Sequence, residues 1–293
     1  MVWHPSNQQR PETTAPWIVN AEVSRVLSVL TDAAGQLLPL RHSGIFLLGS
    51  LAHGGFVTEV SDVDVAVVLD EPTLPAPSDM SELASTVCRW TSGKSQELAT
   101  RLSLFWSTWH HLCTSPCVGR FPAVDRLDFM DSGILLAGVD HRVPSMRPDR
   151  RTVIMDSAAF ALGKLRSTEL QSLEYKLNKV PTLARREVTR AILLPARVTY
   201  TLSTGKVACN GVAASWYAES AQPGYELVSA AFGWRERGLP SDNRAAAAVL
   251  LKQIPDLHGH LQRQLTTLLG ETAVTEYSYF ASETTGTGQE ETG

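Results

Sequence analysis

Apolar residues in the first half of the chain recur with two different spacings. Over residues 18–39 they return every three to four positions, which predicts a helix. Two apolar runs follow, Ile45–Leu48 and Val63–Leu69, and both have the length of buried strands. Arg101–Trp109 alternates in polarity and is rich in aromatic residues, which indicates a third strand. These elements predict a sheet accompanied by helices.

Shorter elements complete the first half. Acidic residues open the segment Asp79–Trp90, as is typical of a helix start, and a second short helix is expected near Gln96–Thr100. Arg126–Phe129 and Gly133–Leu136 are predicted to be short strands. Helices and strands thus alternate along this half, which is typical of an α/β arrangement.

The pattern changes near Pro148, where strand signals end and segments rich in alanine and leucine take over. Glycines and prolines separate these segments from one another. All of them are predicted to be helices, and they comprise Arg151–Ser167, Glu169–Asn178, Arg185–Ser203, Ala213–Ala221, Tyr225–Trp234 and Asp242–Leu269.

The two patterns divide the chain into three parts. Residues 1–147 are predicted to form an α/β domain, in which residues 1–16 are flexible. Residues 148–270 are predicted to form an all-α helical bundle. Residues 271–293 are rich in Thr, Glu, Ser and Gly, so we expect a disordered tail. Ligand sites favour domain interfaces, and we expect a site between the first two parts.

The composition is that of an ordinary globular protein, with 293 residues, 43% hydrophobic and 19% charged. A net charge of −4 gives no general affinity for nucleic acid, so such a partner is not expected. No run of 18 apolar residues predicts a membrane span, and the polar N-terminus does not resemble a signal peptide. The four cysteines lack a matched pair of metal-ligand motifs, which indicates reduced thiols in a cytoplasmic protein.

Two carboxylates mark the start of the second apolar run. Asp62 and Asp64 are two positions apart, so on a strand they point to the same face and repel each other unless a cation lies between them. Magnesium is commonly held by one or two carboxylates together with substrate phosphates. Glycine at position 49 allows a phosphate to approach the backbone, and we include the hydroxyls of Ser50 and Ser61 among the candidate nucleotide-binding groups.

The stretch Gly49–Val65 resembles the signature of the nucleotidyltransferase superfamily. That signature is Gly-Ser followed, after about a dozen residues, by Asp-apolar-Asp, and here eleven residues separate Ser50 from Asp62. The resemblance implies a polymerase-beta-like mixed sheet domain followed by a helical bundle. It also implies that Asp62 and Asp64 hold Mg²⁺ and a nucleoside triphosphate, with Ser50 on the terminal phosphates.

The stretch Arg190–Trp216 resembles the helical domain of the aminoglycoside (streptomycin and spectinomycin) adenylyltransferases. An arginine-bearing helix is followed there by Thr-Gly-Lys and an Ala-Ala-x-Trp helix, as it is here. The resemblance implies that Arg197 and Lys206 neutralise phosphate charge. It also suggests Glu187 as the acid that holds a cationic aminoglycoside, although a glutamate at a helix start needs no ligand to explain it.

The family's third carboxylate lies on a strand 35 to 40 residues beyond the pair, and Arg101–Trp109 carries no acid there. Ser103 occupies the expected position and is a candidate substrate contact. Three explanations stay open: a shifted alignment with Glu97 as the acid, an acid from the next predicted strand, or no third acid. The candidates on that strand are Asp125, Asp128 and Asp131, and Asp128 lies between apolar neighbours.

The sequence therefore favours Mg²⁺-dependent transfer of AMP from ATP to a hydroxyl of a small polar acceptor, for which an aminoglycoside-type antibiotic is one candidate. The missing acid motivates an alternative, a nucleotide-binding or regulatory protein that carries out no chemistry. Transfer to a protein acceptor is a third reading, because nothing in the composition opposes it.

Overall fold

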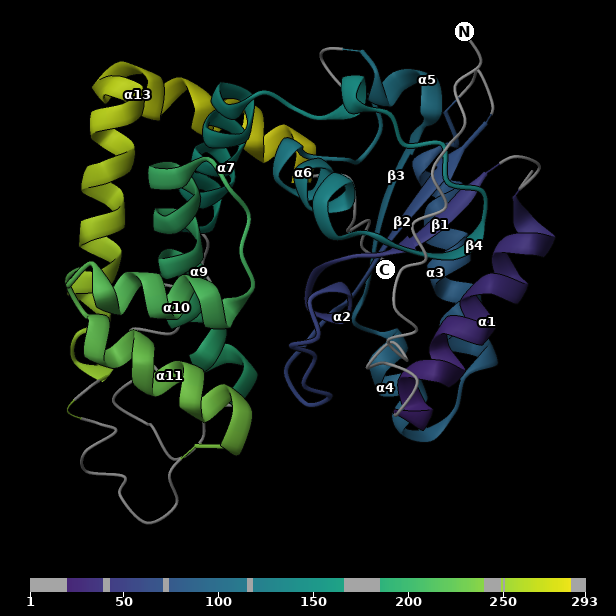
Figure 1. Ribbon diagram of the computed structural model, residues 1–293, viewed down its shortest axis with the longest axis horizontal. Coiled ribbons are helices and arrows are strands. Elements are labelled where there is room, and N and C mark those ends of the chain that lie inside the picture. Colours follow the sequence, from purple (N-terminus) through teal and green to yellow (C-terminus); the bar gives the residue numbers. More distant parts are fainter. Residues whose placement is uncertain are drawn as a thin grey trace, which may run out of the picture.

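A four-stranded mixed sheet forms the centre of the first half in the computed structural model (Figure 1). The model describes residues 20–38, 43–70, 74–114, 118–165, 185–239, 249 and 251–285. The strand order is β3-β2-β1-β4. Antiparallel pairs join β1 to β2 and to β4, whereas β2 and β3 are parallel. The strands are β1 (Gly44–Leu47), β2 (Val63–Leu69), β3 (Leu102–Thr108) and β4 (Ile134–Gly138).

Three helices cover one face of this sheet: α1 (Ala21–Leu37), α3 (Pro77–Trp90) and α4 (Gly93–Ala99). Alternate residues of β2, beginning with Val63 and Val65, pack into the apolar core beneath these helices. The Asn20 side chain accepts a hydrogen bond from the backbone N–H of Val23 and caps α1. The helices and strands predicted for these segments are confirmed.

Two short helices, α5 (Trp109–Leu112) and α6 (Ala123–Ser132), pack on the opposite face. The short helix α2 (Gly49–Ala52) follows β1 and contacts β2 and α6. Phe46, Trp109 and Phe129 pack there around edge-to-face ring contacts. The other alternate residues of β2, Ala66 and Val68, lie in the same cluster. Asp64 has the same strand parity, so its side chain is on the α6 side of the sheet.

Two sequence predictions on this face are wrong. Arg126–Phe129 is helix within α6. The segment between the first two strands, which the glycine at position 49 and its position after an apolar strand suggest is a turn, begins instead with a short helix. In α6, Leu127 packs against Val153 while Phe129 packs into the aromatic cluster. A four-residue stretch of mixed polarity fits either a strand or one turn of helix, so periodicity could not distinguish them.

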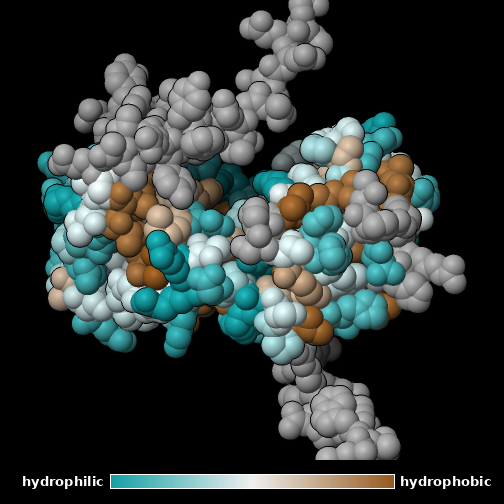
Figure 2. Space-filling view, turned by 90° about the horizontal axis from the view of Figure 1, so that it is seen from above, coloured by the Kyte–Doolittle hydropathy of each residue, from teal (hydrophilic) through white to brown (hydrophobic). Residues whose placement is uncertain are grey.

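The second half is helical and lies beside the sheet, with α6 between the two parts (Figure 1). It contains α7 (Arg150–Leu165), α9 (Arg185–Thr204), α10 (Asn210–Glu219), α11 (Tyr225–Arg237) and α13 (Ile254–Thr285), and Pro144–Met146 forms a short 3₁₀ turn before them. The helix α9 packs against α7, α10, α11 and α13, so it is the central helix of this half. Seen from above, hydrophilic residues gather where the two halves meet (Figure 2).

Other predictions for this half have mixed outcomes. The helix expected at Glu169–Asn178 lies outside the described residues. Residues 271–285, expected to be a disordered tail, continue α13 beyond Gly270, whose backbone is not helical. Alanine and glutamate within this stretch favour helix, which a composition rich in threonine and serine concealed. None of the described helices is long and apolar enough to cross a membrane, and Cys88, Cys113 and Cys209 are free.

Candidate active site

The carboxylate of Asp64 lies against the backbone of Gly49. Gly49 has a φ of +57°, and a Cβ added to it would lie 2.4 Å from Asp64 Oδ2. A backbone hydrogen bond also joins the end of β1 to Asp64, since the Leu48 N–H donates to the Asp64 carbonyl at 2.9 Å. Glycine is therefore required at position 49 for two reasons, the left-handed backbone and the space that the carboxylate occupies.

A third carboxylate reaches this place from α6. Asp128 is 6% exposed, and its Oδ2 accepts the Gly49 N–H at 2.9 Å. Its Oδ1 lies 2.6 Å from Nε2 of His53, which follows α2. Asp125, on the same helix, interacts electrostatically with both Asp64 and Asp128. The sequence candidates Asp125 and Asp128 thus join the pair, although from a helix and not from a strand, and His53 was not anticipated.

Burial and neighbouring groups change the acidity of three of these carboxyls, those of Asp64, Asp125 and Asp128. Burial, followed by the charge of Asp62, raises the pKa of Asp64 to about 6. Burial and the charges of Asp64 and Asp128 raise the pKa of Asp125 to about 7. Burial also acts upward on Asp128, but the hydrogen bonds from His53 and Gly49 outweigh it and leave its pKa lowered. The site therefore holds more negative charge than its surroundings stabilise, as expected of a cation site.

A stripe of arginines on α9 faces these carboxylates from the helical half. Arg186, Arg190 and Arg197 are spaced by four and seven residues, so they fall within roughly 40° of one another around the helix. Arg186 donates to Asp62 Oδ1 at 2.5 Å, and Arg190 lies 3.9 Å from Asp62 Oδ2. Arg197 interacts electrostatically with Asp64, Asp125 and Asp128. Only Arg197 was selected from the sequence, although the helical spacing was a signal for all three.

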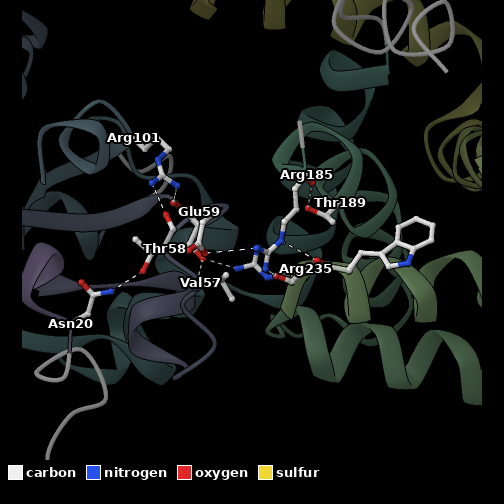
Figure 3. A network of polar contacts seen from close by, with 10 residues as sticks. Asn20, Val57, Thr58, Glu59, Arg101, Arg185, Thr189 and Arg235 are labelled. Carbon is white, nitrogen blue, oxygen red and sulfur yellow. Dashed lines mark hydrogen bonds and ion pairs between the residues drawn. The ribbon is translucent and has the colours of Figure 1, made fainter. Parts of the chain in front are cut away.

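The loop 55–61 connects the sheet half to α9 and α11 through polar contacts, of which the one between Arg235 and Ser61 is buried (Figure 3). Arg235, on α11 and 7% exposed, donates to Ser61 Oγ at 2.6 Å and to the Gly55 carbonyl at 3.3 Å. Arg185 lies 3.8 Å from Glu59 and also donates to backbone carbonyls of α11. Ser61, a sequence candidate for nucleotide binding, thus has its hydroxyl engaged in the contact between the two halves.

Arg101 supports the same loop from the sheet side. It donates to the carbonyls of Ser61 and Thr58 at 2.7 and 2.6 Å, and Asn20 donates to the Thr58 hydroxyl (Figure 3). The loop that precedes Asp62 is therefore held from both halves, which fixes where this carboxylate points.

The remaining sequence candidates lie on or next to three elements, α2, β3 and α9. Ser50 is half-buried in α2, and Ser103 is the direct strand neighbour of Asp64 in the parallel β2–β3 pair. Lys206 is exposed after α9, where its neighbour Val207 packs against α6 and α7. Glu187 is exposed on α9.

The other candidate acids lie elsewhere. Glu97 is exposed on α4, where it acts on Arg101, and Asp131 pairs with Arg147 at the surface. No described residue of β3 is acidic, so the acids beside Asp64 come from α6 alone among the described elements.

Within the described residues there is no group of three or more His, Cys, Asp or Glu side chains arranged to hold a metal ion. Two carboxylates completed by substrate phosphates are nevertheless a normal setting for Mg²⁺. The raised pKa of Asp64 fits this arrangement, since a bound cation would restore its ionised form.

We expect Gly49→Ala to lower the free energy of unfolding by about 1–3 kcal/mol, because it combines backbone strain with a clash against Asp64. Urea unfolding measures this change. Gly55→Ala is the matched control, since a Cβ there meets nothing within 4 Å, and it should change the free energy by less than about 0.5 kcal/mol. Equal effects of the two substitutions would contradict the packing described for Gly49.

Without divalent cations, stability is expected to fall as the pH rises from about 4 to about 7. The carboxyls of Asp64 and Asp125 ionise near 3.8 when unfolded but keep their protons to about pH 6 and about pH 7 when folded. The folded chain binds more protons in this window, so raising the pH favours unfolding, on the order of 1.4 kcal/mol per pKa unit. Urea unfolding in EDTA at several pH values measures it.

The Asp125→Asn variant tests the contribution of Asp125, because its side chain stays neutral at all pH values. It should weaken the pH dependence and leave the part that Asp64 contributes. Asp131→Asn, an exposed position on the same helix, should leave the dependence as in the original chain. An unchanged pH dependence in Asp125→Asn would rule out this carboxyl as a source.

The fold can be compared with known proteins. No family model matches the sequence, and a search of curated proteins finds no match. Among solved structures, the chain is similar to the crystal structure of spectinomycin adenyltransferase AAD(9) from Enterococcus faecialis with ATP and spectinomycin. The TM-score is 0.51 at 15% identity, and the match covers 82% of this chain and 98% of that chain. Over most of its length, the chain therefore has the fold of an adenylyltransferase.

Proposed function

We propose that the protein is a Mg²⁺-dependent nucleotidyltransferase that moves AMP from ATP to a hydroxyl of a small polar acceptor. The observation that carries the proposal is the Asp64 carboxylate seated against Gly49, with Asp62 just before the same strand and arginines opposite. The fold shared with an adenylyltransferase supports it. We assign residues 1–147 to a polymerase-beta-like catalytic domain, 148–270 to a helical clamping domain and 271–293 to a tail of a cytoplasmic enzyme.

In this proposal Asp62 and Asp64 hold Mg²⁺, which supplies positive charge to the phosphate oxygens when bound. The backbone at Gly49 and the hydroxyl of Ser50 receive the terminal phosphates of ATP. Arg197 and Lys206 approach these phosphates from the helical half, and transfer of a loosely bonded phosphoryl group depends mainly on such positioning and charge. These roles are the ones that the sequence resemblance implies. The action of Arg197 on the charges of Asp64 and Asp128 supports them.

We assign the role of third carboxylate to Asp128. The lowered pKa of this group favours its ionised form, and its contact with the Gly49 N–H places its charge beside Asp64. His53 restrains the Asp128 carboxylate from the other side. Asp128 thereby increases the negative charge that a divalent cation neutralises.

A two-stage experiment tests the proposed function. Calorimetric titration should first show that the non-hydrolysable analogue α,β-methylene ATP binds only with Mg²⁺ present. Mass spectrometry should then find an acceptor that gains one AMP while pyrophosphate is released, in a panel that includes spectinomycin, because the neighbouring structure contains it. Binding of the analogue that is indifferent to Mg²⁺ would contradict the proposal.

A second candidate function is nucleotide binding without turnover. Ser103 favours it, because a hydroxyl stands beside Asp64 where the resemblance implies a carboxylate. Loss of a general base typically reduces a rate by about 10² to 10⁴, so transfer could fall to a very low level. This alternative predicts that Mg²⁺ and ATP raise the melting temperature while no acceptor, small molecule or protein, becomes labelled from radioactive ATP. A labelled product would exclude it.

A further inference from the structure

Arg186 and Arg190 lie opposite Asp62, but the proposed function gives neither of them a contact with the nucleotide. Both pair with Asp62 from α9, and the side chains of Asp62 and Arg186 are each about one-third exposed. The Nε of Arg186 is buried without a hydrogen-bond partner. Buried donors usually have a partner, so this nitrogen is available to an acceptor group that approaches the guanidinium.

These arginines contact Asp62, which comes just before the strand that carries Asp64. Gly49 lies against Asp64 and Asp128, and Arg190, like Arg197, also acts on the charge of Asp64. In transfer of a phosphoryl group the attacking and leaving oxygens are roughly in line. If pyrophosphate leaves at the Gly49 end, the acceptor approaches from the Asp62 end, where the two guanidiniums lie.

The charge at this end is positive and becomes more so when a cation binds. Among the described residues, Arg185 forms an ion pair with Glu59, and Arg186 and Arg190 form ion pairs with Asp62. Arg101 binds backbone carbonyls. Once Asp62 serves as a ligand of Mg²⁺, the two guanidiniums lose their carboxylate partner. They are then free to bind oxygens of an anionic group, which arginine binds with two parallel hydrogen bonds.

The described residues offer little to a cationic acceptor at this end. Glu187, the acid suggested by the resemblance, is exposed on α9 and adjoins Arg186 in the chain. Glu97 is exposed on α4, and Ser103 is uncharged beside Asp64. The amines of an aminoglycoside would therefore meet guanidiniums here, and like charges repel.

We infer that Arg186 and Arg190 select the acceptor by its charge, and that the acceptor carries a carboxylate, phosphate or sulfate group near the hydroxyl that receives AMP. The inference rests on the proposed function, because it assumes that Mg²⁺ occupies Asp62 and that the triphosphate lies at Gly49. The acceptor is thus an anionic hydroxylated compound, unlike the spectinomycin of the structural neighbour.

Sulfate is a suitable probe, because it is a divalent anion that arginine pairs bind. The protein is first saturated with Mg²⁺ and α,β-methylene ATP, which fills the triphosphate seat. Sulfate is then titrated calorimetrically at constant ionic strength. We expect binding that Arg186→Gln combined with Arg190→Gln weakens at least tenfold, with a smaller loss in the corresponding double lysine variant.

The matched control is Arg25→Gln, at an exposed position of α1 on the far face of the sheet, which should bind sulfate as the original chain does. Melting curves verify that each variant is folded. Absence of sulfate binding, equal binding by the double glutamine variant, or tighter binding of spectinomycin than of sulfate would overturn the inference. Failure of the nucleotide analogue to bind in the first step would instead overturn the proposed function, and the inference with it.

Discussion

Asp64→Asn is expected to reduce AMP transfer by about 10³-fold or more and, at the same time, to stabilise the fold. A cation ligand in phosphoryl transfer contributes several kcal/mol to the transition state, and asparagine removes the charge while keeping the shape. Burial and the neighbouring carboxylates raise the pKa of Asp64 to about 6, so ionisation of this group at neutral pH destabilises the folded state. Removing the charge should therefore raise the free energy of unfolding, on the order of 1–3 kcal/mol.

Two measurements check this pair of opposite effects. Pyrophosphate release with the best acceptor of the panel gives the loss of rate, and urea unfolding in EDTA at pH 7 gives the gain in stability. Asp70→Asn is the control, since Asp70 follows the same strand and is exposed. A variant that loses stability together with activity would indicate a structural role for Asp64.

Arg235→Ala is expected to lower the free energy of unfolding by about 2–4 kcal/mol, the largest effect expected for any side chain at the contact between the halves. Its guanidinium is 7% exposed and donates to Ser61 Oγ and the Gly55 carbonyl. Truncation leaves buried acceptors with fewer partners and creates a void under α11. Binding of Mg²⁺ and nucleotide should also weaken, because the loop before Asp62 loses its support.

Urea unfolding of the full chain measures the change, with Arg237→Ala as the control. Arg237 is exposed in the last turn of the same helix, so its removal should change the free energy by less than about 0.5 kcal/mol. If both variants unfold alike, the buried contact of Arg235 does not stabilise the joint between the halves.

The catalytic candidates closest to one another in sequence were predictable because their geometry is local. Two aspartates two positions apart on a strand must share a face, and Gly-Ser after an apolar strand indicates close approach by an anion. The structure places Asp62 and Asp64 before and within β2 and Gly49 against Asp64. The alternation of sheet elements and the later run of helices likewise followed from the spacing of apolar residues.

The partners of these residues were decided by tertiary packing. Asp128 contacts Gly49 across 79 positions of sequence, and Arg186 and Arg235 reach Asp62 and Ser61 across 124 and 174 positions. The local sequence pattern predicted a strand at Arg126–Phe129, where the structure has the helix α6, so it could not predict the direction of the Asp128 side chain. The sequence by itself determined which charged groups the strand displays, because strand parity is a property of neighbouring residues. Which charges face these strand residues was determined only by the tertiary packing of α6, α9 and α11. These helices are far apart in the chain and pack through their apolar faces, and this packing fixes where their polar residues lie.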